Sequence, residues 1–184
     1  MDTLDSSLYL SNDDIYLLGN GNWFRSYEKL GAHPAKAADG TSGYHFAVWA
    51  PHVQSVHVIG DFNDWDEAAS PLTKSETGDV WEGFIPGVVA GQLYKFLLVS
   101  HDGEKLYKAD PYAFFAELPP GTASRTADIS GYAWKDEKWM AERAERPMLK
   151  SPLNIFEVHL GSWKRHGNEP QGEPREDGTW PGPG

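Results

Sequence analysis

Cysteine is missing from this chain of 184 residues. Without thiols the protein forms no disulfide, holds no metal through thiolates and has no cysteine nucleophile. Basic residues are also scarce, because 16 Lys and Arg stand against 27 Asp and Glu and give a net charge of −11. Since a polyanion repels another polyanion, this balance disfavours nucleic acids and anionic membranes as partners.

Long hydrophobic runs are missing as well. The longest strongly apolar run, residues 96–99, is far shorter than the ~20 residues that a helix needs to cross a bilayer. The first residues are acidic, and the apolar segment of a signal peptide does not follow them. We therefore expect a cytoplasmic protein, and its composition of 40% hydrophobic and 13% aromatic residues suits a folded core.

The middle of the chain has the pattern of short β-strands. Residues 44–50, 55–59, 80–85 and 93–99 are rich in β-branched and aromatic residues, with Gly, Pro, Asn and Asp between them. The Asp-Gly pair after the last segment predicts a hairpin with residues 104–108 as its second strand. Short strands without a long helical period favour a mainly β fold, an antiparallel β-sandwich of the immunoglobulin-like kind, over a doubly wound sheet.

A helical lead is predicted before these strands. Ser11 and Asp14 have the spacing of a capping box, with Asp in place of the usual Glu. Residues 23–30 place apolar groups at helical spacing and end at Gly31, so we expect two short helices. Pro34 then predicts an extended exit from the lead.

The C-terminal part changes character twice. Residues 135–144 are charged and favour a short helix, which we interpret as a connector. Residues 153–160 resemble a strand buried on both faces. Residues 164–184 are rich in Gly, Pro and charge and are expected to be disordered. Because a strand of the buried type then has no neighbours to pair with, we expect that the chain is cut inside a second domain.

The densest group of polar residues is the loop after the second strand, GDFNDWD, at residues 60–66. Asn63 and the acids shape a turn through bonds to the backbone, and Trp65 could then project outward. A sugar has an apolar C–H face and a rim of hydroxyls, so a flat ring beside polar groups suits it. The alternative is that Trp65 folds back onto its own sheet, and the sequence leaves both open.

Other chemistry finds less support in the residues. Asp61 and Asn63 fit the first and third places of an EF-hand calcium loop, but Trp65 occupies the fifth and no Gly follows. The seven histidines lack the spacing of a metal site. Glycoside hydrolysis needs two carboxylates across a bond, and the spacing of acids along a loop establishes no such pair. Lys95 alternates with apolar neighbours and is expected opposite Tyr94 and Phe96, either as a donor to sugar hydroxyls or as a solvent-facing lysine.

Several motifs together resemble the N-terminal region of bacterial 1,4-α-glucan (glycogen) branching enzymes. They are YEKLGAHP at 27–34, FAVWAP at 46–51, VIGDFNDW at 58–65, LYKF at 93–96, KADPYA at 108–113 and FEVHLGSW at 156–163. The sandwich resembles the family-48 carbohydrate-binding module of these enzymes, and the last motif resembles the first strand of their α-amylase-type (β/α)8 barrel. The sandwich pattern is shared with debranching enzymes, whereas the first and last motifs are more specific to branching enzymes.

The resemblance implies four parts in the chain and a function for the longer protein. The parts are a helical lead (1–38), the β-sandwich module (39–133), a connector (134–150) and a truncated barrel start with one orphan strand (151–184). The implied reaction cleaves α-1,4-glucan and transfers the chain to a 6-hydroxyl by retaining chemistry, without a metal or organic cofactor. Its catalytic carboxylates belong to barrel strands that this sequence lacks, so the chain alone is expected to be inactive.

The resemblance also implies a glycan site for α-1,4-glucans such as glycogen and amylose. Glycogen-binding relatives use two Trp platforms and a Lys. Trp65 matches the first platform, Lys95 matches the Lys, and Tyr107 is the substitute for the second Trp. Asn63 is taken as a further contact, and Ser124 stands where relatives carry an Asn. The alternatives are a structural module that only packs on the parent's own barrel, and the module of a debranching-type glycoside hydrolase.

Overall fold

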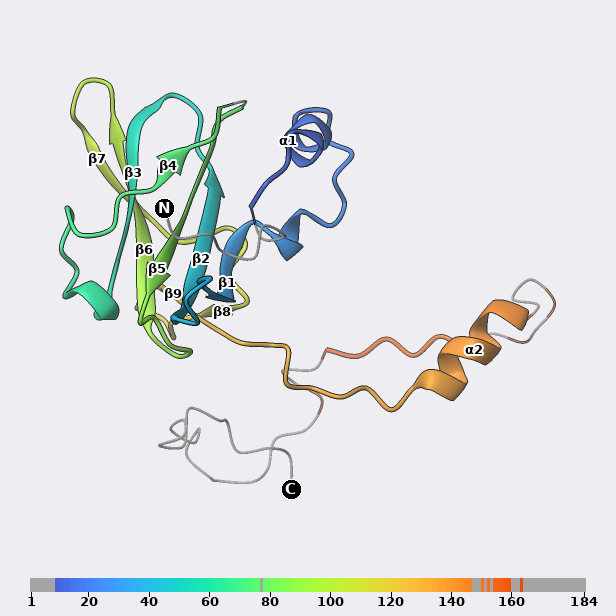
Figure 1. The fold of residues 1–184 in the computed structure, drawn as a ribbon. Coiled ribbons are helices and arrows are strands. Elements are labelled where there is room, and N and C mark those ends of the chain that lie inside the picture. The colour runs from blue at the N-terminus through green and yellow to red at the C-terminus, as the bar shows by residue number, and fades with distance from the viewer. Residues whose placement is uncertain are drawn as a thin grey trace, which may run out of the picture. The chain divides into compact units, whose positions relative to one another are not determined.

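The computed structural model describes residues 9–76, 78–146, 150, 152, 154–159 and 163 (Figure 1). The chain forms two compact units, Met1–Ser130 and Gly131–Gly184. Both sheets belong to the first unit.

The first sheet has four antiparallel strands in the order β1-β2-β5-β4. These strands are β1 (Gly31–Lys36), β2 (Ser42–Trp49), β4 (Thr73–Lys74) and β5 (Val80–Pro86). The expected strands at 44–50 and 80–85 are therefore confirmed. β1 falls in the stretch expected as an extended exit from the lead, and it contains Pro34 because it is an edge strand that pairs only with β2.

The second sheet is built around a long central strand. Its elements are β3 (Val53–Gly60), β6 (Leu93–Ser100), β7 (Lys105–Lys108), β8 (Phe115–Ala116) and β9 (Ser124–Arg125). One edge of β6 pairs with β3, and its other edge pairs with β7 and, near its start, with β9. The β6–β7 pair is the predicted hairpin, with Leu97 opposite Tyr107.

The core lies between the two sheets, so the predicted antiparallel sandwich is confirmed. Alternate residues of three strands enter it: Tyr44, Phe46 and Val48 from β2, Val56 and Val58 from β3, and Tyr94 and Phe96 from β6. Each of these side chains is at most 5% exposed. Because of this alternation, the intervening residues of the strands lie on the two outer faces of the sandwich. Other segments of the chain pack against both of these outer faces.

The N-terminal lead covers the outer face of the first sheet. Helix α1 (Asn12–Gly19) begins with the predicted capping box between Ser11 and Asp14. The second expected helix, at 23–30, is wrong, because only the three-residue 3-10 helix η1 (Ser26–Glu28) forms there. Tertiary packing overrides the helical spacing: Leu30 is fully buried in a small second core, where Leu10, Leu18, Trp23 and Tyr112 pack against Leu30, Ala47 and Val80.

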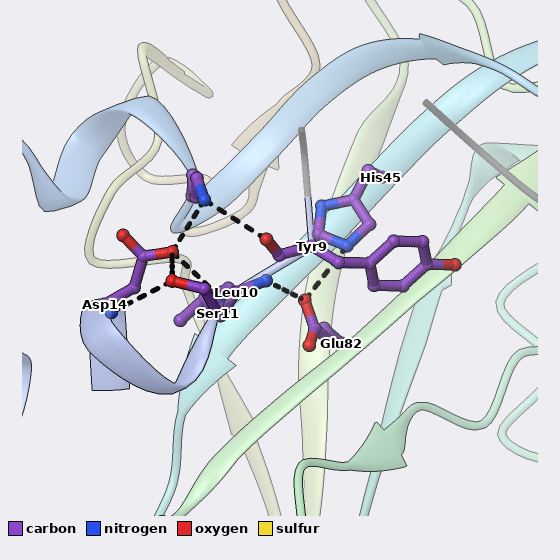
Figure 2. Close-up of polar contacts among 7 residues, drawn as sticks. Tyr9, Leu10, Ser11, Asp14, His45 and Glu82 are labelled. Atoms are coloured by element: carbon purple, nitrogen blue, oxygen red, sulfur yellow. Dashed lines mark hydrogen bonds and ion pairs between the residues drawn. The ribbon is translucent and has the colours of Figure 1, made fainter. Parts of the chain in front are cut away.

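Polar contacts fasten the start of the lead to the sheet (Figure 2). The backbone N–H of Leu10 donates to Oε2 of Glu82 at 3.2 Å, and the same oxygen lies 3.3 Å from Nε2 of the fully buried His45. Nζ of Lys29 donates to the backbone oxygen of Tyr9 at 3.1 Å and to Oδ2 of Asp14 at 2.6 Å.

The second unit contains helix α2 (Glu137–Glu145), which confirms the helix predicted in the connector. Residues 154–159 form neither helix nor strand. A β-strand is defined by hydrogen bonds to a neighbouring strand, and residues 154–159 have no such neighbour among the described residues. The barrel strand expected at 153–160 therefore stays a prediction. The expectation of disorder at 164–184 lies outside the described residues. Among the described residues, the structure has no helix long and apolar enough to span a membrane.

Candidate functional site

The loop after β3 is shaped by the amide of Asn63. This loop begins with the 3-10 helix η2 (Asp61–Asn63). Oδ1 of Asn63 accepts from the N–H of Gly60 at 2.9 Å, while Nδ2 donates to the oxygen of Val58 at 2.9 Å and to Oγ of Ser70 at 3.1 Å. The structure thus places Asn63 as a brace inside the loop, since its amide already bonds to protein atoms.

Trp65 lies at the turn of this loop with its ring partly in solvent. Asp64 and Trp65 both have positive φ, 52° and 59°, which turns the chain sharply. The indole Nε1 donates to Oδ1 of Asp61 at 3.1 Å, and Oδ2 of Asp61 accepts from the N–H of Leu93 at 2.7 Å. The side chain is 37% exposed, so it does not fold into the core.

Lys95 lies on the outer face of the second sheet, opposite Tyr94 and Phe96, as its alternation predicts. Its Nζ donates to Oγ1 of Thr122 at 2.7 Å. Ser124, the position where relatives are expected to carry an Asn, is only 2% exposed and faces the core. The residue of this loop that meets Lys95 is therefore Thr122, and sequence reasoning missed it.

Tyr107 reaches the same outer face from β7. It stands opposite Leu97, two residues along β6 from Lys95, and is 48% exposed. Its hydroxyl donates to Oε1 of Glu67, while Oε2 of Glu67 accepts from Nζ of Lys105. The bond from Lys105 is the largest cause that lowers the pKa of the Glu67 carboxyl, and the bond from Tyr107 adds to it.

These residues make up one surface, which we call the platform face. Its members are Asp61, Trp65, Glu67, Lys95, Tyr107 and Thr122. It offers two partly exposed aromatic rings and the ammonium group of Lys95, which suit stacking and hydrogen bonding to a polyhydroxylated ligand. Among the described residues, no group of three or more His, Asp or Glu side chains is placed to hold a metal ion.

A buried polar network supports the platform face from the core side. The hydroxyl of Tyr94 donates to Oδ2 of Asp110 at 2.5 Å, and the N–H of Tyr112 donates to Oδ1 at 2.8 Å. The N–H of Asp110 donates to Oγ of Ser124 at 2.8 Å. Burial raises the pKa of Asp110 despite these bonds, and burial together with the nearby carboxyl raises the pKa of Tyr94.

Comparison with known proteins agrees with this architecture. Residues 29–113 match the family model of carbohydrate-binding module 48, described as the isoamylase N-terminal domain. The chain is 52% identical over 163 residues to the 1,4-alpha-glucan branching enzyme GlgB of Butyrivibrio fibrisolvens, covering 89% of this chain and 25% of that enzyme. For the GlgB enzymes of Nitratidesulfovibrio vulgaris and Bacillus subtilis the identities are 49% and 42%, over 88% and 83% of this chain and 25% and 24% of the enzymes.

The chain thus spans about a quarter of the length of these curated relatives. A crystal structure of Klebsiella pneumoniae pullulanase complexed with maltotriose aligns with 70% of this chain and 12% of the pullulanase chain, at 24% identity and a TM-score of 0.47. Trp65, Lys95 and Tyr107 all lie within the residues that match the family model. Most of the chain is therefore similar to part of the GlgB branching enzymes, and its residues 29–113 match carbohydrate-binding module 48.

Proposed function

We propose that the platform face binds α-1,4-glucan chains such as those of glycogen and amylose. The observation that carries this proposal is that Lys95 and Tyr107 lie on the outer face of the second sheet, and that the loop of Trp65 is bonded to Tyr107 through Glu67. The names of the relatives, 1,4-alpha-glucan branching enzymes, supply the class of ligand.

Each residue has a distinct part in this binding. The exposed side of the Trp65 ring stacks on the C–H face of a glucose unit, and Tyr107 offers a second ring beside it. Lys95 donates to sugar hydroxyls while Thr122 holds its ammonium group in place. Asn63 shapes the loop instead of touching the sugar, because its amide is engaged with the loop itself.

For the longer protein we propose the reaction of its relatives. It cleaves an α-1,4-glucan chain, holds the cut piece as a covalent glycosyl-enzyme and transfers it to a 6-hydroxyl as an α-1,6 branch. We also propose that the longer protein is cytoplasmic, and that this module packs against the protein's own catalytic barrel. The 184 residues alone are proposed to be inactive, so they should leave the iodine staining of amylose unchanged.

A second candidate function, docking against a catalytic domain, is favoured by a hollow elsewhere on the first unit. The hollow has a volume of about 350 Å³, and Tyr27, Phe114 and Ile129 line it. These side chains are 48%, 36% and 64% exposed. Exposed apolar groups gathered at one site are typical of an interaction surface.

Electrophoresis in native gels with and without glycogen separates the two functions. Glycogen should retard the chain, and Trp65→Ala should abolish the retardation. Trp49→Ala is the matched control, because Trp49 is 56% exposed but lies on β2 in the other sheet. Absence of retardation for the unmodified chain would reject glucan binding and leave docking as the function of the module.

A further inference from the structure

Glu67 joins the two sides of the platform face. It belongs to the loop that follows β3, yet its carboxylate accepts bonds from Tyr107 and Lys105 of β7, 40 and 38 residues away in sequence. Both of its oxygens are used in these contacts. Glu67 is therefore committed to the protein and is not one of the groups that the face offers to a ligand.

The loop must lie across the second sheet to make these contacts. Residues on both sides of the loop are bonded to β3: Asn63 to the oxygen of Val58, and the oxygen of Ser70 to the N–H of Val58. β7 lies two strands away, beyond β6, a separation of ~10 Å that exceeds the reach of a Glu side chain. The burial of Leu97 agrees, since Leu97 points outward like Lys95 but is only 1% exposed.

Fastening the loop also fastens both rings. A single residue separates Glu67 from Trp65, so the anchor on β7 limits the movement of the indole. At the other end, the bond from the Tyr107 hydroxyl fixes the orientation of the second ring. A glucan chain that contacts both rings binds more tightly when their relative placement is set before binding, because less conformational freedom is then lost.

We propose that Glu67 is a positioning residue that sets the placement of Trp65 relative to Tyr107 and thereby determines the affinity for glucan. This inference rests on the proposed function, since it concerns the same face. The ion pair with Lys105 holds the loop, and the bond with Tyr107 holds the ring.

The test compares variants of the full 184-residue chain by calorimetric titration with maltoheptaose. Glu67→Ala should weaken binding by about tenfold, because two rings then have to be ordered on binding. Glu67→Gln keeps an acceptor for Tyr107 and should fall between Glu67→Ala and the unmodified chain. Glu104→Ala is the matched control: it removes an exposed acid from the β6–β7 hairpin that Glu67 contacts and should leave the affinity unchanged.

Two further readouts distinguish positioning from simple loss of folding. The melting temperature of Glu67→Ala should stay close to that of the unmodified chain, while the NMR signal of the Trp65 indole N–H, assigned by its absence in Trp65→Phe, should shift or broaden without ligand. Lys105→Met serves as the second variant if Glu67→Ala unfolds. It keeps the side-chain stem, loses the ion pair and should also weaken binding.

The outcomes separate this inference from the function on which it rests. Weakened binding by Glu67→Ala with an altered indole signal supports it. Unchanged affinity of Glu67→Ala and Lys105→Met, in a chain whose binding Trp65→Ala abolishes, would overturn the positioning role alone. Unchanged affinity of Trp65→Ala would overturn the proposed function itself.

Discussion

Asp61 holds the indole of Trp65 and the start of strand β6 with a single carboxylate. Oδ1 accepts from the Trp65 Nε1–H at 3.1 Å, and Oδ2 accepts from the N–H of Leu93 at 2.7 Å. Asp61 therefore fixes the position of the Trp65 ring relative to the sheet that carries Lys95, even though Trp65 itself belongs to a loop. A binding site on a loop gains precision when a bond of this kind ties it to a strand.

Replacement of Asp61 should affect both stability and binding. Asp61→Ala removes two hydrogen bonds and should lower the free energy of unfolding by about 1–2 kcal/mol. Its affinity for maltoheptaose should fall as well, because the indole loses its partner. Urea denaturation and calorimetric titration measure the two effects. Asp64→Asn, which removes a neighbouring charge and tolerates the positive φ of 52°, should change neither quantity; equal effects of both variants would assign the result to charge alone.

Thr122 and Ser124 should differ in what they support. Thr122→Val removes the acceptor of Lys95 and should weaken glucan binding by about fivefold, with little change in stability. Ser124→Ala leaves the buried N–H of Asp110 without its partner and should cost about 1–3 kcal/mol of unfolding free energy, with affinity retained in the folded fraction. If Thr122→Val lowered the stability and Ser124→Ala weakened binding instead, the placement of Thr122 on the platform face would be contradicted.

Asp110 should make stability depend on pH in a defined direction. Because burial raises its pKa, the folded chain holds the Asp110 proton more tightly than the unfolded chain does. This contribution to stability is present below the ordinary value of 3.8 and is lost as pH rises through the raised pKa. Asp110→Asn has no such proton, so its stability relative to the unmodified chain should increase as pH rises through that window.

Unfolding by urea at a series of pH values checks this prediction for Asp110. Asp39→Asn is a control of opposite sign, because the N–H of Thr41 donates to Asp39 at 2.8 Å and lowers the pKa of its carboxyl. The contribution of Asp39 is lost as pH falls, so its variant should gain relative stability toward low pH. Parallel pH profiles for the unmodified chain and Asp110→Asn would refute the role assigned to Asp110.

The attachment of the N-terminal lead should depend on Lys29. Lys29→Met removes the bonds to the backbone of Tyr9 and to Asp14, which should cost about 1 kcal/mol and loosen the segment around Leu10. Hydrogen exchange of the Leu10 amide, which donates to Glu82, should become faster. Lys138→Met is the matched control, because the Lys138 side chain is 90% exposed and its ion pair is a long one, with Nζ 3.8 Å from Oε1 of Glu142. Unchanged exchange at Leu10 would show that apolar packing alone holds the lead.

Local patterns predicted most of the strands, the capping box of α1 and the side of the sheet that Lys95 occupies. Each of these follows from alternation, or from residues three or four apart. The missed features join residues far apart in sequence, such as Glu67 with Tyr107 and Lys95 with Thr122. No local period encodes such pairs, and an acid in a turn-forming loop gives no signal of its distant partner.

The helix expected at 23–30 illustrates the same limit. Its apolar spacing is that of a helix, but Trp23 and Leu30 instead fill a cluster with Ala47 and Val80 of the first sheet. Burial in that cluster decides the local backbone, since packing routinely overrides helix propensity. The apolar spacing indicated a helix, but it did not show against which element these residues would pack.

The measurement that tests the central claim most directly is an NMR titration of the chain with maltoheptaose, observed at the tryptophan indole N–H groups. Glucan binding at the platform face predicts that the Trp65 signal shifts saturably, while the signal of Trp49, on the other sheet, stays in place. A Trp65 signal that remains unchanged at saturating maltoheptaose would contradict the account.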